Sequence, residues 1–171
     1  MKIKLKYLIL VTIAGLIIAL DQATKLYIHT HFSLGESITV INDFFNITYV
    51  RNTGAAFGFM STAQETFRNI IFLTMPPVAL LVIVMIMRGV HDRDLIQILA
   101  LSSIFGGAIG NYIDRIRFRY VIDFLDFHIQ NEYVWPAFNV ADIAIVIGVG
   151  ILILIMFRKE EPGTEPLPSE T

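Results

Sequence analysis

Cysteine is absent from this 171-residue chain, which excludes disulfides, thiolate nucleophiles and cysteine-based metal sites. Charge is scarce as well, since Asp, Glu, Lys and Arg together make up 16% of the residues, against about a quarter in a typical soluble domain. The formal net charge of -2 contains no basic excess, so we expect no nucleic-acid partner. With 55% hydrophobic residues and a mean hydropathy of +0.65, the composition is typical of a membrane protein.

Four segments are long and apolar enough to cross a bilayer core of about 30 Å, which takes roughly 20 helical residues. The expected spans are residues 5–28, 70–87, 95–113 and 137–157, and Pro76-Pro77 interrupts the second. The first span follows three lysines, as the apolar part of a signal peptide would, but no small-x-small cleavage site closes it. We therefore expect an uncleaved first helix.

The distribution of lysine and arginine predicts the orientation of the spans, because cytoplasmic segments are enriched in both residues. Seven of these residues fall in the two termini and the short turn after the second span, and five fall in the other two loops. The sequence therefore predicts that both termini are cytoplasmic. Arg115, Arg117 and Arg119, just past the third span, run against this rule, so we expect them to have another role.

The loop between the first two spans contains two β-branched and aromatic runs, residues 37–41 and 44–50. Asn42-Asp43 between them is a turn signal, which predicts a β-hairpin, and the alternating stretch 120–128 is suited to join it. Residues 1–158 are expected to form one domain, followed by a disordered acidic and proline-rich tail, residues 159–171. The predicted fold is a mainly α membrane protein with four transmembrane helices, cytoplasmic N and C termini, and a small periplasmic β-sheet and loop region.

Ionisable side chains gather at the periplasmic ends of the expected spans, where such groups are costly and usually functional. They are Asp21, Lys25, Asp114, Arg115 and Asp142, with Asp123 and Asp126 in the intervening loop. Lys25 lies one helical turn after Asp21, so an ion pair is at least as good an interpretation as catalysis. The same holds for Asp114 with its neighbour in the sequence. Asp142 differs, because no cation lies near it in the sequence and Asn139 shares its helix face.

Several reaction types find no support in the spacing of the polar residues. The four histidines show no His-Glu-x-x-His pattern, and no Gly-x-Ser-x-Gly elbow is present. Ser102 and Ser103 lie in mid-span, at a different depth from Lys25, which argues against a Ser-Lys dyad. What is left is a pair of aspartates that share one proton, one activating water while the other donates to a carbonyl. From spacing alone, a proton-coupled carrier is an equally good interpretation.

Five motifs occur in order along the chain. They are Asp21-Gln-Ala-Thr-Lys25, Asn52-Thr-Gly-Ala-Ala-Phe57, Gly106-Gly-Ala-Ile-Gly-Asn-Tyr-Ile-Asp-Arg115, Val121-Ile-Asp-Phe124 and Phe138-Asn-Val-Ala-Asp142. Together with four spans in so short a chain, they resemble the lipoprotein signal peptidase (signal peptidase II) family over roughly residues 5–157. A carrier would more often show inverted repeats and acidic residues near mid-membrane. A non-enzymatic lipid-binding or assembly protein would need the loops, but not two converging carboxylates.

The resemblance implies an intramembrane aspartyl endopeptidase that removes signal peptides from diacylglyceryl-modified prolipoproteins, cutting just before the lipidated cysteine. It assigns catalysis to Asp123 and Asp142. The other polar motif positions are implied to support the site or to bind the lipid-modified substrate: Asp21, Lys25, Asn52, Gly54, Asn111, Asp114, Arg115 and Asn139.

The resemblance also implies where the protein works and with what. No metal or organic cofactor is expected. The expected partners are the prolipoprotein substrates and membrane phospholipids, with the protein itself a monomer. The expected location is the bacterial cytoplasmic (inner) membrane, with the active site near the periplasmic face. Globomycin, an inhibitor of the family, is expected to bind between the two aspartates.

Overall fold

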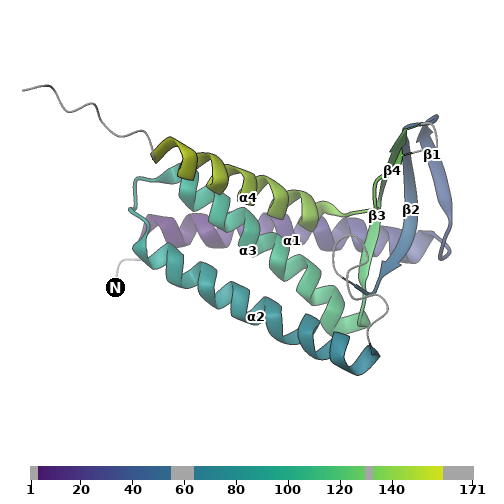
Figure 1. Ribbon diagram of the computed structural model, residues 1–171, viewed down its shortest axis with the longest axis horizontal. Coiled ribbons are helices and arrows are strands. Elements are labelled where there is room, and N and C mark those ends of the chain that lie inside the picture. The colour runs from purple at the N-terminus through teal and green to yellow at the C-terminus, as the bar shows by residue number, and fades with distance from the viewer. Residues whose placement is uncertain (1–3, 55–63, 130–132, 160–171) are drawn as a thin grey trace, which may run out of the picture.

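A computed structural model describes residues 4–54, 64–129 and 133–159 of the chain (Figure 1). Within these ranges, four helices run side by side as a bundle, and a four-stranded antiparallel sheet lies across one end of it. The helices are α1 (Leu5–His31), α2 (Glu65–Gly89), α3 (Leu95–Phe118) and α4 (Val140–Lys159). Each contains a segment long and apolar enough to cross a membrane. The predicted four-helix membrane fold with a small sheet is therefore confirmed. The expected disordered tail, apart from its first residue, lies outside the described residues.

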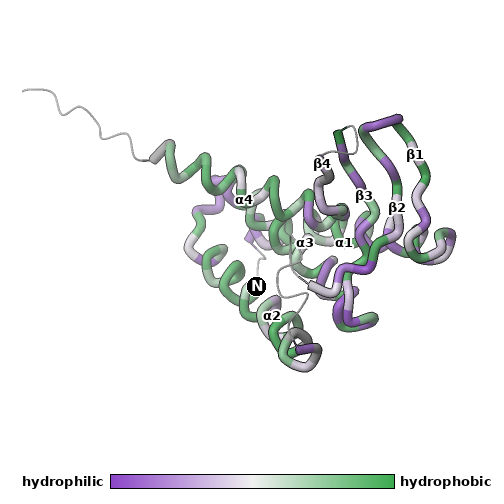
Figure 2. Tube along the Cα trace, turned by 45° about the vertical axis from the view of Figure 1, so that its right-hand side comes forward, coloured by the Kyte–Doolittle hydropathy of each residue, from purple (hydrophilic) through white to green (hydrophobic). Residues whose placement is uncertain are grey.

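The outward faces of the helices are apolar, as expected for a protein surrounded by lipid. Val11 on α1 is 70% exposed and Leu154 on α4 is 69% exposed, and Figure 2 shows apolar residues along the full length of the bundle. Hydrophilic residues gather in the turns and around the sheet. Inside the bundle, α3 packs against each of the other three helices, and it is the most buried of the four spans.

Close packing around α3 depends on three glycines of one predicted motif. A Cβ atom built on Gly106 would lie 2.9 Å from the backbone of Ala14 on α1. A Cβ on Gly110 would lie 2.6 Å from the carboxylate of Asp21, and one on Gly107 would collide with the Ala141 carbonyl oxygen on α4. The glycines therefore allow α1 and α4 to approach α3 closely, as small residues commonly do between membrane helices.

Pro76 and Pro77 do not interrupt the second span, because α2 continues through both. Pro77 has no backbone N–H to donate to the Leu73 carbonyl one turn earlier. The hydroxyl of Tyr112 on α3 donates to that carbonyl instead, at 3.2 Å. A side chain from a neighbouring helix thus satisfies a backbone group that proline leaves free, which explains why the helix tolerates it.

The end of the bundle opposite the sheet is held by an apolar cluster and by a buried lysine. The cluster joins α1, α2 and α3, with Met87 and Ile98 fully buried in it. Lys6 is 2% exposed, and its ammonium donates to the carbonyls of Arg88 and Val90 at 3.1 and 2.7 Å. A cation at these carbonyls satisfies the C-terminal end of α2 and complements its dipole.

The sheet contains β1 (Ser37–Ile41), β2 (Phe45–Asn52), β3 (Val121–Ile129) and β4 (Tyr133–Val134), hydrogen-bonded in that order. The predicted hairpin is therefore confirmed, and the alternating stretch after α3 does join it as β3. α3 ends at Phe118, and the left-handed conformation of the next residue, Arg119, turns the chain into β3. A second apolar cluster, which includes Ile28 and Tyr49, packs the sheet against α1. The last turn of α3 and the start of β3 thereby come to lie next to the start of α4.

Candidate active site

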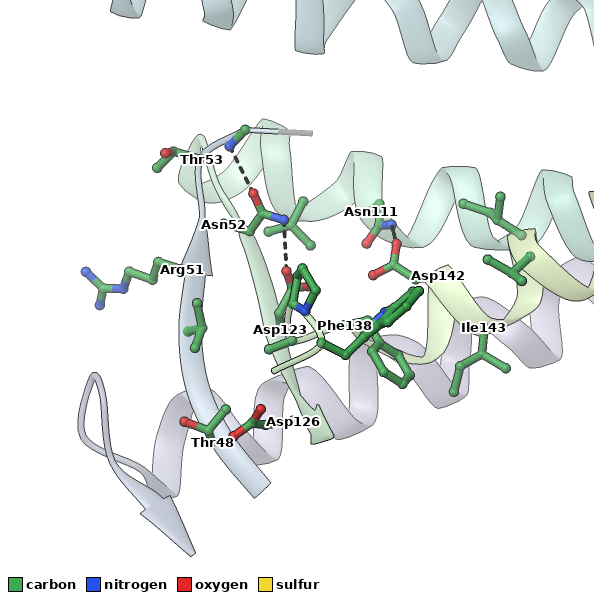
Figure 3. Close-up of a pocket in the computed structure, with 18 of the residues that line it drawn as sticks. Thr48, Arg51, Asn52, Thr53, Asn111, Asp123, Asp126, Phe138, Asp142 and Ile143 are labelled. Carbon is green, nitrogen blue, oxygen red and sulfur yellow. Dashed lines mark hydrogen bonds between the residues drawn. The ribbon is translucent and has the colours of Figure 1, made fainter. Parts of the chain in front are cut away.

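Asp142 lies in the first turn of α4, and the helix start itself fixes its carboxylate (Figure 3). The backbone N–H of Asn139 donates to Oδ2 of Asp142 at 3.2 Å. In return, the Asn139 side-chain oxygen accepts from the Asp142 N–H at 3.0 Å. This reciprocal pair is a capping box, which satisfies two donors at the start of the helix. The other oxygen, Oδ1, accepts from the Asn111 amide at 2.7 Å.

Asp123 enters the same region from β3, where it is only 2% exposed. Its Oδ1 accepts from the side-chain amide of Asn139 at 2.6 Å, and its Oδ2 accepts from the amide of Asn52 at 2.9 Å. Asn139 therefore contacts both aspartates at once, Asp123 through its side-chain nitrogen and Asp142 through its backbone and side-chain oxygen. The two carboxylates named from the sequence lie side by side across one asparagine.

The surroundings of Asp123 favour its protonated form. Burial raises the pKa of this carboxyl to about 7, and the negative charge of Asp142 adds to the rise. The hydrogen bonds from Asn52 and Asn139, together with the charge of Lys25, act in the opposite direction. At pH values below 7, Asp123 therefore carries a proton beside a second carboxyl group, which is the arrangement that acid-base catalysis by a carboxyl pair requires.

Both aspartates face a cavity of about 900 Å³ beneath β2 and β3. Its wall is mostly apolar and includes Val50, Phe138, Ile143, Ile145, Val146 and Ile147. Arg115 also lines it, with its guanidinium 5.2 Å from the centre of the Phe72 ring and 3.4 Å from the Asn111 carbonyl. Gly54 also lines the cavity, and its N–H donates to the side-chain oxygen of Asn52 at 3.0 Å. The rest of that motif, residues 55–57, lies outside the described residues.

Three further predicted residues form a buried ionic cluster behind the aspartates. Lys25 contacts Asp21 at 2.9 Å and Asp114 at 3.2 Å. The expected ion pair within α1 is therefore present. Asp114, whose expected partner was the adjacent Arg115, pairs with Lys25 instead, because its side chain points from α3 toward α1. Asp126 lies at the edge of the cavity, where Asn46 donates to it at 3.3 Å.

Two contributors to the site were not singled out from the sequence. Gln22 donates to Asp21 at 3.2 Å, to Asp114 at 3.0 Å and to the Gly110 carbonyl at 3.1 Å, which ties α1 to α3. Phe138 lines the cavity, and its carbonyl accepts the N–H groups of Phe124 and Leu125 next to Asp123. Both residues belong to motifs quoted above: Gln22 follows Asp21, and Phe138 begins the motif that ends at Asp142. Their position in these motifs was the sequence feature from which a role in the site could have been predicted. Within the described ranges, no three His, Asp or Glu side chains converge in the way that metal ligands would.

Comparisons with known proteins identify the family of the chain. A family model described as signal peptidase (SPase) II matches residues 13–158. The lipoprotein signal peptidase of Syntrophus aciditrophicus is 48% identical over 148 residues, which cover 86% of this chain and 91% of that protein. That of Geobacter sulfurreducens is 48% identical over 143 residues, covering 84% and 88%. A solved bacterial membrane enzyme has a TM-score of 0.78 at 35% identity and covers 92% of both chains.

Fold and comparisons together define a multi-pass bacterial membrane peptidase. The chain belongs to the signal peptidase II family. The family predicted from the five motifs is confirmed. It replaces the two alternatives considered above, a proton-coupled carrier and a non-enzymatic lipid-binding or assembly protein.

Proposed function

We propose that this protein is an intramembrane aspartyl endopeptidase that removes signal peptides from diacylglyceryl-modified prolipoproteins, cutting just before the lipidated cysteine. The observation that carries the proposal is the contact of Asn139 with both Asp123 and Asp142 at the wall of a largely apolar cavity. Two carboxyl groups held side by side, one of them protonated near neutral pH, are suited to activate water against a peptide bond. The family relatives named as lipoprotein signal peptidases support the same substrate class.

In the first step, Asp142 takes a proton from a water molecule, and the water oxygen attacks the scissile carbonyl carbon. Asp123 gives its proton to the carbonyl oxygen, so that a neutral gem-diol forms. In the second step, Asp142 returns its proton to the peptide nitrogen while Asp123 takes one from a gem-diol hydroxyl. The carbon–nitrogen bond breaks, and a carboxyl group and an amine are released. Both aspartates return to their starting protonation states.

The cavity supports the assignment of a lipidated substrate. Its apolar wall suits acyl chains, and the guanidinium of Arg115 suits a substrate carbonyl or a lipid ester. Asn52 and Gly54 also line the cavity. An amide side chain can hydrogen-bond an extended peptide, and a residue without a side chain lets the peptide approach closely.

The proposed orientation in the membrane rests on the lysine and arginine bias of the sequence. We place the protein in the cytoplasmic membrane as a monomer, with both termini inside and the sheet on the periplasmic side. That is the side on which the scissile bond of an anchored lipoprotein precursor lies. Membrane phospholipids then surround the helices, and the mechanism requires neither a metal nor an organic cofactor.

The proposal is tested by incubating the purified protein in detergent with a diacylglyceryl-modified precursor peptide and locating the cut by mass spectrometry. Cleavage directly before the modified cysteine is the expected result, with the unmodified peptide cut poorly. Equal cleavage of both peptides would contradict the proposed substrate class, and no cleavage of either would contradict the enzyme.

A further inference from the structure

Lys25 is buried and fully partnered near the end of α1 that meets the sheet, although none of its three polar contacts is with an aspartate of the proposed pair. Its side chain is 2% exposed. The ammonium lies 2.9 Å from Asp21 Oδ2, 3.2 Å from Asp114 Oδ2 and 2.8 Å from Asn111 Oδ1. An ammonium has three N–H donors, so these three oxygens use all of them.

The first partner leads to the segment that carries Asp142. Asp21 uses one carboxylate oxygen for Lys25 and the other for the backbone N–H of Ala141, at 3.0 Å. Ala141 immediately precedes Asp142 and lies in the first turn of α4. Asp21, itself fully buried, therefore connects Lys25 on α1 to the start of α4.

The second partner leads to the segment that carries Asp123. Oδ2 of Asp114 accepts from the backbone N–H of Ile122 at 3.1 Å as well as from Lys25. Ile122 immediately precedes Asp123 on β3 and is 1% exposed. Asp114 therefore connects the same ammonium to the strand that holds the other aspartate.

The third partner reaches Asp142 directly. The Asn111 side-chain oxygen accepts from Lys25 at 2.8 Å and from Asn139 at 3.1 Å. Because a lysine ammonium can only donate, it fixes which end of the Asn111 amide is the oxygen. The NH2 end must then face Asp142, to which it donates at 2.7 Å.

We propose that Lys25 is a positioning residue that sets the separation and orientation of Asp123 and Asp142 by holding Asp21, Asp114 and Asn111 at one point. One cation joins α1 to α3, and its three partners each fix a segment or a side chain of the pair. The proposal rests on the aspartyl mechanism proposed above, because it concerns the geometry that this mechanism needs. Displacement of a reacting group by about 1 Å commonly costs about 100-fold in rate.

The competing explanation is that Lys25 only neutralises two buried carboxylates and contributes nothing but stability. Lys25→Met alone does not separate the two, because it leaves Asp21 and Asp114 buried without a counter-ion, which is strongly destabilising. The decisive variant is the triple substitution Lys25→Met, Asp21→Asn and Asp114→Asn. It removes all three charges, and an amide oxygen at positions 21 and 114 can still accept from Ala141 and Ile122.

Cleavage of the diacylglyceryl precursor and thermal unfolding are measured for wild type and the triple variant. A buried ionic cluster replaced by neutral residues commonly keeps or gains stability, so we expect the triple variant to fold. The positioning role predicts that its kcat falls about 100-fold while its KM changes little. A folded triple variant with a kcat near that of the wild type would overturn the proposal, since charge neutralisation would then suffice.

If the triple variant fails to fold, the same measurements on Lys25→Arg test the proposal. This variant keeps the charge, but the planar guanidinium cannot arrange three acceptors around a single nitrogen atom. We expect a folded protein with kcat reduced at least about tenfold, and full activity would overturn the proposal.

Lys6→Met is the matched control, because Lys6 is an equally buried lysine at the far end of the bundle. It should lower the unfolding temperature and leave kcat unchanged. The two proposals fail differently. If the wild type does not cut the precursor, or Asp123→Asn still cuts it, the aspartyl mechanism is wrong. If both behave as proposed and the triple variant stays active, only the role of Lys25 is wrong.

Discussion

Replacing Asn52 by alanine should move the alkaline limb of the pH-activity profile upward. The Asn52 amide donates to Asp123 at 2.9 Å and stabilises its ionised form, which keeps the pKa of Asp123 lower than it would otherwise be. Without this donor, the pKa of Asp123 rises above 7. In the proposed mechanism Asp123 must be protonated to act as the acid, so activity is present below its pKa and lost above it.

The size of the shift follows from the strength of the lost hydrogen bond. Hydrogen bonds to charged groups contribute about 1.5–3 kcal/mol, and one pKa unit corresponds to about 1.4 kcal/mol. The full loss would therefore raise the pKa by about one to two units. Because Asn52 is half-buried at the cavity, water can replace part of its contribution, and we expect about one unit.

The assay is kcat against pH over roughly pH 5 to pH 9, with the diacylglyceryl precursor at saturating concentration. Asn46→Ala is the matched control, since Asn46 lies on the same strand and donates to Asp126 at 3.3 Å. Its profile should coincide with that of the wild type. An alkaline limb that stays in place in Asn52→Ala, or moves to lower pH, would refute the reasoning.

Three further outcomes follow from the packing and the site. Gly110→Ala should destabilise the protein by about 1–3 kcal/mol in thermal or denaturant unfolding, because its Cβ would press on the buried carboxylate of Asp21. Gly150→Ala is the control and should leave the stability unchanged, since there is open space around Gly150. Tyr112→Phe should lower stability by about 1 kcal/mol, since it leaves the Leu73 carbonyl without a donor, and an unchanged unfolding temperature would contradict this account of α2. Globomycin and hydroxyl-bearing mimics of the gem-diol should compete with substrate, while EDTA should leave kcat unchanged. Loss of activity in EDTA that zinc restores would contradict the proposed chemistry.

Much of the fold could be predicted because its signals are local. Apolar runs of sufficient length defined the four spans, and Asn42-Asp43 between two β-branched runs defined the hairpin. The continuity of α2 through Pro77 could not be predicted. It is supported by the Tyr112 hydroxyl, which is far away in the sequence and comes close only once α2 and α3 pack.

Most residues of the candidate site could be named from the sequence, but their connections could not. The motifs named Asp114 and Lys25, but helical spacing shows only which residues share one face of one helix. The pairing of Asp114 with Lys25 joins residues on different helices. The close approach of the Asp21 carboxylate to Gly110 is likewise visible only in the packed bundle. In the same way, nothing in the sequence shows that Asn139 caps α4 and also reaches Asp123 on β3.

The central claim is that Asp123 and Asp142 act as one catalytic pair. The most direct measurement is kcat on the diacylglyceryl precursor for Asp123→Asn, Asp142→Asn and the double variant, each shown to be folded in detergent by its thermal unfolding curve. Residues that act as a unit lose as much activity singly as together. Each single variant should therefore be about as inactive as the double variant. Near-normal turnover in either folded single variant would contradict it.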